Sequence, residues 1–161
     1  MPNHCYQSVY IKGPSALVYE LYHNLNSKEP RFCDAVLPIP FAKSTGMVGY
    51  DWRVENWGTK WDVAEVEIME ELLMSDEEGP EEVAWFSFKC WTAWSPPIPV
   101  WNQLHALGID VESDYEDEGG MFAGEYQYGE GDCWVPEAED WCQACEDGTC
   151  PDLSPTEEEV A

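Results

Sequence analysis

The chain has 161 residues, enough for one compact domain with an appendage but too few for two full-sized domains. Its formal net charge of −26, from 33 acidic and 7 basic residues, excludes direct electrostatic binding to nucleic acid or to an anionic membrane, because both require an excess of Lys and Arg. With 44% hydrophobic and 14% aromatic residues, the chain can still bury a core, unlike a wholly disordered acidic protein.

The first half of the chain predicts a strand, a helix and irregular connections. Residues 4–11 alternate between two faces, as in a strand, and residues 15–26 place apolar side chains at helical spacing after a Gly-Pro break. The proline-interrupted residues 28–41 are expected to form an extended connection, and the Trp- and Gly-rich residues 50–61 a loop.

The second half predicts mainly strands. The expected elements are a strand at 61–72, a strand at 83–91, a helix at 98–106 and an acidic hairpin made of 110–115 and 121–128. The first of these strands alternates imperfectly, so a helix is an alternative there, and a charged turn over 75–82 follows it.

This order of elements, β-α-β-β-α-β with one extra strand, predicts an α+β fold. We expect a ferredoxin-like sandwich, in which two helices cover one face of an antiparallel sheet. The predicted domain covers residues 1–129, and residues 130–161 are expected to form a separate acidic, Cys-rich tail.

The charge is distributed unevenly along the chain. Residues 1–61 hold six basic and five acidic residues, a net charge of +1, whereas residues 62–161 hold 28 acidic residues against Lys89 alone, a net charge of −27. This asymmetry predicts one strongly negative face and one ordinary face. The alternative is that the acidity only keeps the protein soluble.

Two features bear on localisation. Residues 1–10 lack the basic start and apolar run of a secretory signal, and no stretch approaches the roughly 20 apolar residues of a membrane helix. The seven cysteines are an odd number, so they cannot all pair within one chain, and a reducing compartment is the simpler assumption. We therefore expect a soluble, cytoplasmic protein that does not bind membranes.

Several motifs carry a resemblance to a known family. They are N-H-C-Y-Q-S-V-Y-I-K-G-P at 3–14, W-R-V-E-N-W-G-T-K-W-D at 52–62, T-A-W-S-P-P-I-P-V at 92–100 and G-G-M-F-A-G-E-Y at 119–126. Together they resemble the YubB-type ferredoxin-like family of phage and plasmid proteins. The resemblance spans most of the first 129 residues and implies the fold and a mobile-element origin, without an established reaction.

A tryptophan-rich run is the candidate for a pocket. Indoles frame a carboxylate, an amide and an ammonium, a combination that could bind a small ligand or a partner; the candidate residues are Glu55, Asn56, Trp57, Lys60 and Trp61. The alternative is that the two tryptophans only cover one end of the sheet, while the polar groups pair or satisfy the loop backbone.

Metal binding and catalysis have weaker signals in the sequence. Cys133, Cys142, Cys145 and Cys150 form C-x8-C-x2-C-x4-C, and thiolates at C-x2-C spacing can bind zinc; free tail thiols are the alternative. None of the three histidines adjoins a Ser or Cys nucleophile motif, and the chain has no Gly-rich phosphate loop. We therefore expect a protein that is not an enzyme and has no cofactor, apart from the possible zinc.

Acidic residues from neighbouring elements of the predicted fold are the main candidates for partner binding. With one aromatic anchor, they are Glu65, Glu67, Glu70, Glu71, Glu112, Asp114, Glu116, Asp117, Glu118 and Tyr126. B-DNA carries about one charge per 1.7 Å, and a folded surface that approaches this density could occupy the basic groove of a nucleic-acid-binding protein.

The leading hypothesis is therefore a phage or plasmid accessory protein in the host cell cytoplasm. It would bind a basic, nucleic-acid-binding host or defence protein, with DNA mimicry as one mechanism of inhibition. The alternatives are a small zinc- or ligand-binding module with a four-cysteine tail, and a scaffold that self-associates through exposed tryptophans.

Overall fold

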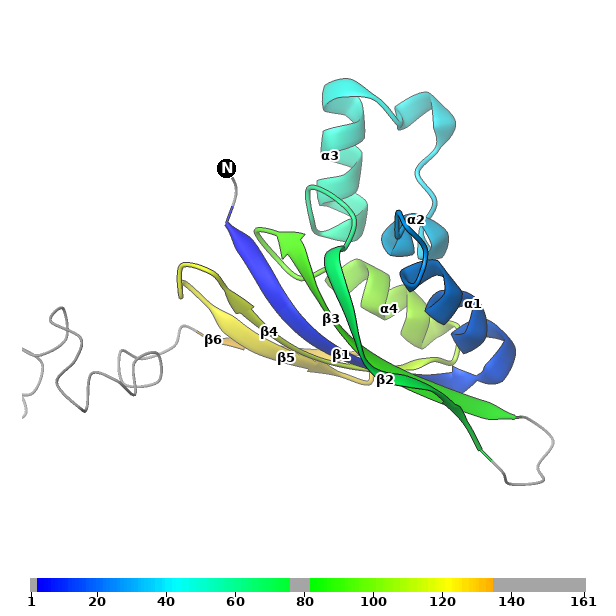
Figure 1. Cartoon of the computed structure of the whole chain (residues 1–161). Helices are drawn as coiled ribbons and strands as arrows, with labels where there is room; N and C mark the ends of the chain where they lie inside the picture. Colours follow the sequence, from blue (N-terminus) through cyan, green and yellow to red (C-terminus); the bar gives the residue numbers. More distant parts are fainter. Residues whose placement is uncertain (1–2, 76–81, 135–161) are drawn as a thin grey trace, which may run out of the picture.

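The structure is a computed structural model that describes residues 3–75 and 82–134 (Figure 1). Strand β1 (His4–Pro14) is followed directly by helix α1 (Ser15–Leu25). The odd-numbered residues of β1 from Cys5 to Ile11 are buried, whereas the even-numbered residues are exposed or half-buried. This alternation confirms the predicted strand and places one face of β1 in the core.

Helix α2 (Phe32–Val36) lies where an extended connection was predicted, so that prediction was wrong. Phe32 is fully buried, and the carboxylate of Asp62 accepts hydrogen bonds from the backbone N–H groups of Cys33 and Asp34 at 2.8 and 3.0 Å. A carboxylate at the start of a helix satisfies N–H groups that have no partner inside the helix. The cap comes from far along the chain, which a local sequence pattern cannot reveal.

Helix α3 (Gly46–Trp57) lies where a loop was predicted, so this prediction was also wrong. A short 3-10 helix, η1 (Phe41–Lys43), precedes it. The helix ends at Gly58, whose φ of 76° is the left-handed conformation in which helices commonly end. The indole N–H of Trp57, 3% exposed, donates to the carbonyl oxygen of Leu37 at 2.8 Å.

The remaining elements follow the predicted order closely. They are β2 (Ala64–Met74), β3 (Val83–Ala93), α4 (Ile98–Ala106), β4 (Asp110–Asp117), β5 (Ala123–Gln127) and β6 (Glu130–Trp134). Most of the charged turn predicted over 75–82 lies outside the described residues. Strand β6 extends the sheet to Trp134, five residues into the range expected as a tail, and residues 135–161 lie outside the described part.

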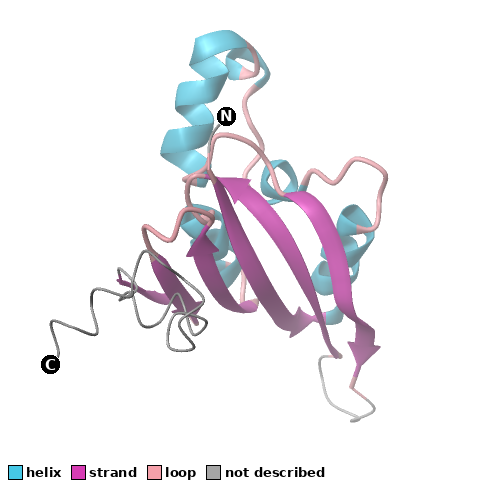
Figure 2. Ribbon diagram, turned by 60° about the vertical axis from the view of Figure 1, so that its left-hand side comes forward, coloured by secondary structure: helices cyan, strands magenta, loops and turns pink. Residues whose placement is uncertain are grey.

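The described residues have an α+β fold, with six antiparallel strands in the order β2-β3-β1-β4-β5-β6. The helices pack on one face, where Val18 and Leu21 of α1, Phe86 and Phe88 of β3 and Trp101 of α4 form the centre of the core. Figure 2 shows helices behind the sheet and α3 standing beyond one end of it. Within residues 3–75 and 82–134, no helix covers the other face. No helix among these residues is long and apolar enough to cross a membrane.

Candidate functional site on the open face of the sheet

The face of the sheet opposite to the helices, here called the open face, displays side chains from all six strands. Successive side chains of a strand point to opposite faces, so the pairing register shows which residues share this face. On β1 and β3 they include Tyr6, Ser8, Tyr10, Lys12, Trp85, Ser87, Lys89 and Trp91. On β4, β5 and β6 they include Asp110, Glu112, Asp114, Glu116, Ala123, Glu125, Gln127, Glu130, Asp132 and Trp134.

Three carboxylates lie directly abreast across the last three strands. Asp114 of β4 pairs with Glu125 of β5, which pairs with Asp132 of β6; we call this set the acidic rung. In the described part of the chain, no Lys, Arg or His nitrogen lies within 4.0 Å of these carboxylates. Like charges directly opposite in a sheet are destabilising. The acidic rung therefore lowers the stability of the fold.

An aromatic row runs beside the acidic rung. Trp91, Tyr6, Glu116, Ala123 and Trp134 are successive partners across β3, β1, β4, β5 and β6, and we call them the aromatic rung. The rings of Tyr6 and Trp91 meet edge to face with 5.3 Å between their centroids, and Trp134 is 47% exposed. Tryptophan and tyrosine side chains are enriched among the residues that contribute most to protein–protein binding.

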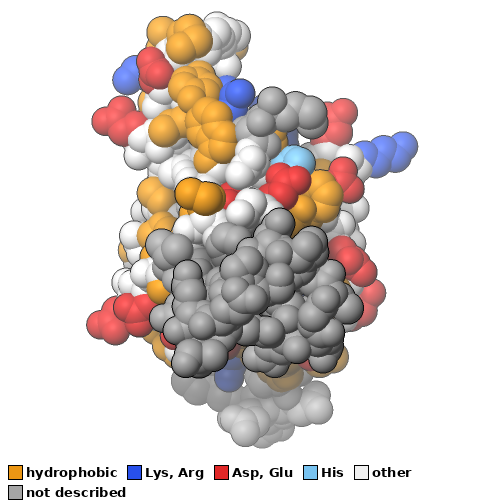
Figure 3. All heavy atoms as spheres, turned by 90° about the vertical axis from the view of Figure 1, so that its left-hand side faces the viewer, with side chains coloured by type: hydrophobic (Ala, Val, Ile, Leu, Met, Phe, Trp, Pro, Cys, Tyr) orange, Lys and Arg blue, Asp and Glu red, His pale blue; other side chains and the backbone are white. Residues whose placement is uncertain are grey.

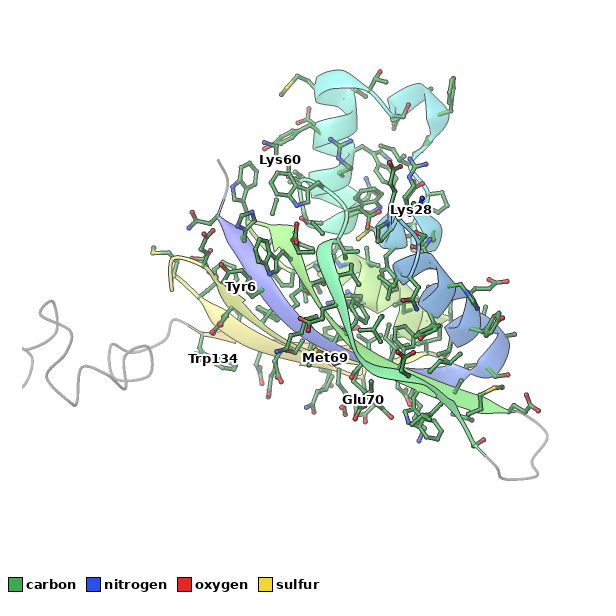
Figure 4. The ribbon with its side chains drawn as sticks, in the orientation of Figure 1. Tyr6, Lys28, Lys60, Met69, Glu70 and Trp134 are labelled. Atoms are coloured by element: carbon green, nitrogen blue, oxygen red, sulfur yellow. The ribbon has the colours of Figure 1, made fainter. Side chains whose placement is uncertain are left out.

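A hollow of about 610 Å³ lies over the acidic and aromatic rungs. Its lining includes Tyr6 and Trp91 at one end, Trp134 at the other, and Asp114, Glu116 and Glu125 between them, together with Lys89. Figure 4 shows Trp134 and Glu70 projecting from the side of the sheet away from the helices. Carboxylates and aromatic faces both attract cations. The hollow therefore suits a guanidinium or ammonium group.

A third row continues the acidic surface on the side away from the aromatic rung. Glu112, Gln127 and Glu130 are successive partners across β4, β5 and β6. The hydroxyl of Tyr128 donates to the Glu112 carboxylate at 2.7 Å, and this bond with a negative acceptor raises the pKa of Tyr128. A second hollow, of about 310 Å³, is lined by Tyr10, Met69 and Glu112 among others. The acidic surface and its hollows thus extend along the strands.

The structure places five of the predicted partner-binding acids on the open face: Glu67, Glu70, Glu112, Asp114 and Glu116. The pairing of Glu67 with Lys89 and of Glu70 with Ser87 sets their side, because both partners lie on that face. Strand β2 is irregular, with several shifts of register along its length. Its Glu65 is exposed at a φ of 49°, a left-handed conformation that marks one of these irregularities.

Four predicted partner-binding residues have other surroundings. Glu71 accepts a hydrogen bond from the hydroxyl of Tyr22 on α1, so it lies on the side of the helices. Asp117 is only 6% exposed, and its carboxylate accepts hydrogen bonds from the backbone N–H groups of Gly119 and Met121. The carboxylate of Glu118 accepts a hydrogen bond from the backbone N–H of His4 at 2.8 Å. The fourth residue is Tyr126.

Tyr126 was predicted as a surface anchor, but it is only 1% exposed, and its hydroxyl donates to Asn102 of α4 at 2.8 Å. Because Tyr126 pairs with Ser113, whose side chain faces the helices, Tyr126 faces them too. The predicted role of Tyr126 is therefore corrected to a role in the core.

The predicted pocket around residues 55–61 is divided between different surroundings. Glu55 is exposed, Asn56 donates to the carbonyl oxygen of Trp52 at 2.8 Å, and Trp57 is buried. Of these five residues, only Lys60 and Trp61 lie together, in the loop that is hydrogen-bonded to the end of β3. The residues therefore do not form the single pocket that the sequence suggested.

Lys60 lies among three aromatic rings. Its Nζ is 5.7 Å from the ring centroid of Tyr50, 5.8 Å from that of Trp61 and 5.4 Å from that of Trp94. A hydrogen bond of 3.0 Å from the backbone N–H of Ala93 to Thr59 Oγ1 ties this loop to the end of β3. We call the three rings the Lys60 cage; it joins α3 to the sheet.

Exposed apolar side chains form a separate surface near α3. Phe41, Met47 and Val48 are 96%, 70% and 56% exposed. Figure 3 shows hydrophobic side chains gathered at the end of the molecule where α3 lies. This surface belongs to the helical side of the molecule, away from the open face.

The four cysteines considered for zinc are placed only in part. Cys133 is exposed on β6, and Cys142, Cys145 and Cys150 lie outside the described residues. Among the residues that are described, no group of three or more His, Cys, Asp or Glu residues could hold a metal ion.

Three other cysteines, Cys5, Cys33 and Cys90, are buried, as expected for small apolar side chains. Burial raises the pKa of Cys5 to about 12 and also raises the pKa of Cys33 and of Cys90. These three thiols are therefore protonated at neutral pH, and they lack the thiolate form that reacts with electrophiles or binds metals.

The sequence prediction missed Glu125 and Asp132 as members of the site, although Glu125 lies within the predicted hairpin strand at 121–128. The signal for Asp132 was present in the alternation of residues 130–134 after the Tyr128-Gly129 pair, which suits a two-residue turn. It was overlooked because the predicted domain ended at residue 129.

Comparison of the chain with family models, with curated proteins and with solved structures found no match.

Proposed function

We propose that this is a non-enzymatic binding protein, which uses the open face of its sheet to occupy the nucleic-acid-binding surface of a basic protein. The acidic rung is the observation that carries the proposal. Asp114, Glu125 and Asp132 are held abreast on regular, paired strands although their mutual repulsion lowers stability. A cationic partner would remove this repulsion, so binding and relief of the repulsion are coupled.

The density of charge on the open face supports competition with nucleic acid. Residues of one strand that share a face are about 6.8 Å apart, so the row from Asp110 to Glu116 spans about 20 Å. The last three strands place seven carboxylates on this face: Asp110, Glu112, Asp114, Glu116, Glu125, Glu130 and Asp132. This is about one charge per 3 Å, close to the ~3.4 Å of one strand of a duplex.

The aromatic rung supplies aromatic contact area, which charge alone does not provide. Electrostatic complementarity mainly speeds association and selects the partner, whereas buried aromatic contacts slow dissociation. Trp91, Tyr6 and Trp134 border the hollow whose centre is acidic. An arginine of the partner could therefore stack on a ring while its guanidinium meets Asp114 or Glu125.

We also infer a ferredoxin-like arrangement for the part from β1 to β4. Helix α1 lies on the connection from β1 to β2, helix α4 lies on that from β3 to β4, and each pair of strands has one other strand between its members. Helices α2 and α3 and strands β5 and β6 are additions to this arrangement. Taken with the resemblance to phage and plasmid proteins, it makes a host or defence protein the proposed partner.

Capture from a bacterial lysate tests the proposed function. Immobilised protein is mixed with nuclease-treated lysate, and the retained proteins are eluted with duplex DNA or with a neutral polymer. The test variant carries Glu112→Gln, Asp114→Asn and Glu116→Gln on the open face. The control variant carries Glu20→Gln, Glu29→Gln and Glu55→Gln, three exposed carboxylates outside the sheet, and has the same net charge.

We expect the wild type and the control variant to retain basic nucleic-acid-binding proteins that duplex DNA releases and the neutral polymer does not. The test variant should lose them. If both variants retained these proteins to the same extent, the position of the carboxylates on the open face would not matter for binding. Retention of only neutral or acidic proteins would refute the proposed function.

A further inference from the structure

Strand β6 forms one edge of the sheet, and all five of its residues are exposed. Among the described residues, no strand pairs with its outer side. A sheet edge carries backbone N–H and C=O groups that can bind another extended chain. Glu130 and Asp132 point to the open face, whereas Gly131 and Cys133 point to the other.

The hairpin between β5 and β6 determines which backbone groups are available at this edge. Its two-residue loop, Tyr128-Gly129, has φ angles of 50° and 89°, as in a type I′ turn. Such a turn makes Gln127 and Glu130 a hydrogen-bonded pair, and such pairs alternate along the strands. Residues Glu130 and Asp132 therefore direct their backbone groups toward β5, and Gly131 directs its own outward, as does Cys133.

We propose that β6 binds an extended basic segment of the partner as a seventh strand, with lysine or arginine at alternate positions. This inference rests on the proposed function and adds the mode of binding. A strand that forms hydrogen bonds with Gly131 and Cys133 faces Asp132 in a closely spaced, non-hydrogen-bonded pair. Its basic side chains then continue the acidic rung, and a residue opposite Trp134 can rest on the indole.

Charge selects this occupant over a second copy of the chain. Two antiparallel β6 strands centred on Asp132 would place the two Asp132 carboxylates opposite each other, beside both copies of Glu130. A segment with alternating basic residues instead gains a favourable cross-strand pair at each of these positions. The acidic side chains therefore block self-association at the edge while they favour a basic strand.

Two synthetic peptides test strand addition. One alternates lysine and threonine over eight residues, and the other contains four lysines followed by four threonines, so their composition and charge are identical. We expect the full chain to bind the alternating peptide about tenfold more tightly, because only alternation places every lysine on one face of a strand. Amide hydrogen exchange in the complex should show new protection at Gly131 and Cys133.

Substitutions at Gly131 separate backbone pairing from charge. Gly131→Pro removes the outward N–H, whereas Gly131→Ala keeps it and adds a Cβ that has ordinary contacts, 3.5 Å from the nearest atoms. The proline variant should bind the alternating peptide no better than the block peptide, and the alanine variant should bind like the wild type. The exchange measurement uses the wild type, so the test stands even if the proline variant does not fold.

The outcomes distinguish the two proposals. Equal affinity for both peptides, without protection at Gly131 and Cys133, would overturn strand addition. If the test variant of the lysate experiment, here called the open-face variant, then bound the peptides more weakly than the wild type, the proposed function would remain. If neither peptide bound at low salt and the open-face and control variants behaved alike in the lysate experiment, both proposals would fail.

Discussion

Neutralising the middle carboxylate of the acidic rung should stabilise the fold. In Glu125→Gln, the side chain keeps its size and its exposed place on β5, but it no longer repels Asp114 and Asp132 on either side. The substitution should therefore raise the free energy of unfolding while it weakens binding to a basic partner. A wild-type protein that is less stable than a variant with a neutral side chain in its binding surface is expected where that surface is selected for function.

The magnitude follows from the register. Directly opposed Cβ atoms are about 5 Å apart, which places the two carboxylates of a pair about 6 Å apart. Coulomb's law in water gives about 0.7 kcal/mol for each such pair, and screening at 0.1 M salt lowers this to about 0.4 kcal/mol. With two neighbours, Glu125→Gln should stabilise the chain by about 0.8 kcal/mol at 0.1 M salt and by close to nothing at 1 M.

Urea denaturation followed by tryptophan fluorescence measures this effect, because urea is uncharged and does not screen the rung. The matched control is Gln127→Glu, since Gln127 already lies between Glu112 and Glu130. It should destabilise the chain by a similar amount at low salt. A neutral or destabilising Glu125→Gln, or a gain that persists at 1 M salt, would show that the repulsion is absent.

Three further predictions concern stability. Lys60→Met removes the ammonium from three rings and should lower the free energy of unfolding by about 1–2 kcal/mol in urea; an unchanged value would mean that the Lys60 cage holds no cation. Gly124→Ala places a Cβ on the ring of Tyr115 and should cost about 1–3 kcal/mol, whereas Gly131→Ala, with room for its Cβ, should leave the urea midpoint unchanged. The Cys5 thiol has its pKa raised from 9.0 to about 12, so its stabilising effect is complete below about pH 9 and is lost toward pH 12. Cys5 should account for up to ~1.4 kcal/mol per pH unit of the fall in the free energy of unfolding there, in addition to the contributions of Cys33 and Cys90, and Cys5→Ala should reduce the slope by that amount.

The sequence predicted the elements whose signals are local. The alternation of residues 4–11 and the apolar spacing of residues 98–106 arise from burial of one face, which a strand or helix imposes on its own residues. Helix α2 could not be found in this way, because Asp62 satisfies its first N–H groups from another part of the chain. Its stability depends on tertiary structure.

The site was predicted in part. The errors of the prediction arise because the sequence does not show which residues of neighbouring strands pair. The predicted residues Glu112, Asp114 and Glu116 do share the open face, because alternate residues of one strand point to the same side, whereas the predicted Asp117 is buried. The face of Tyr126 depends on which residue of β4 it pairs with, and a sequence does not state this pairing. A shift of one residue would have exposed Tyr126 and buried Glu125, so composition alone could not separate the two.

The position of β1 in the sheet has a consequence for synthesis of the chain. β1 lies between β3 and β4, and its register pairs Pro14 with Val83 and Lys12 with Asp110. The ribosome adds ~5–20 residues per second, so the first strand waits at least several seconds for either neighbour. During that interval its apolar side has no sheet to join, and a nascent chain stalled before residue 83 should be a substrate for chaperones.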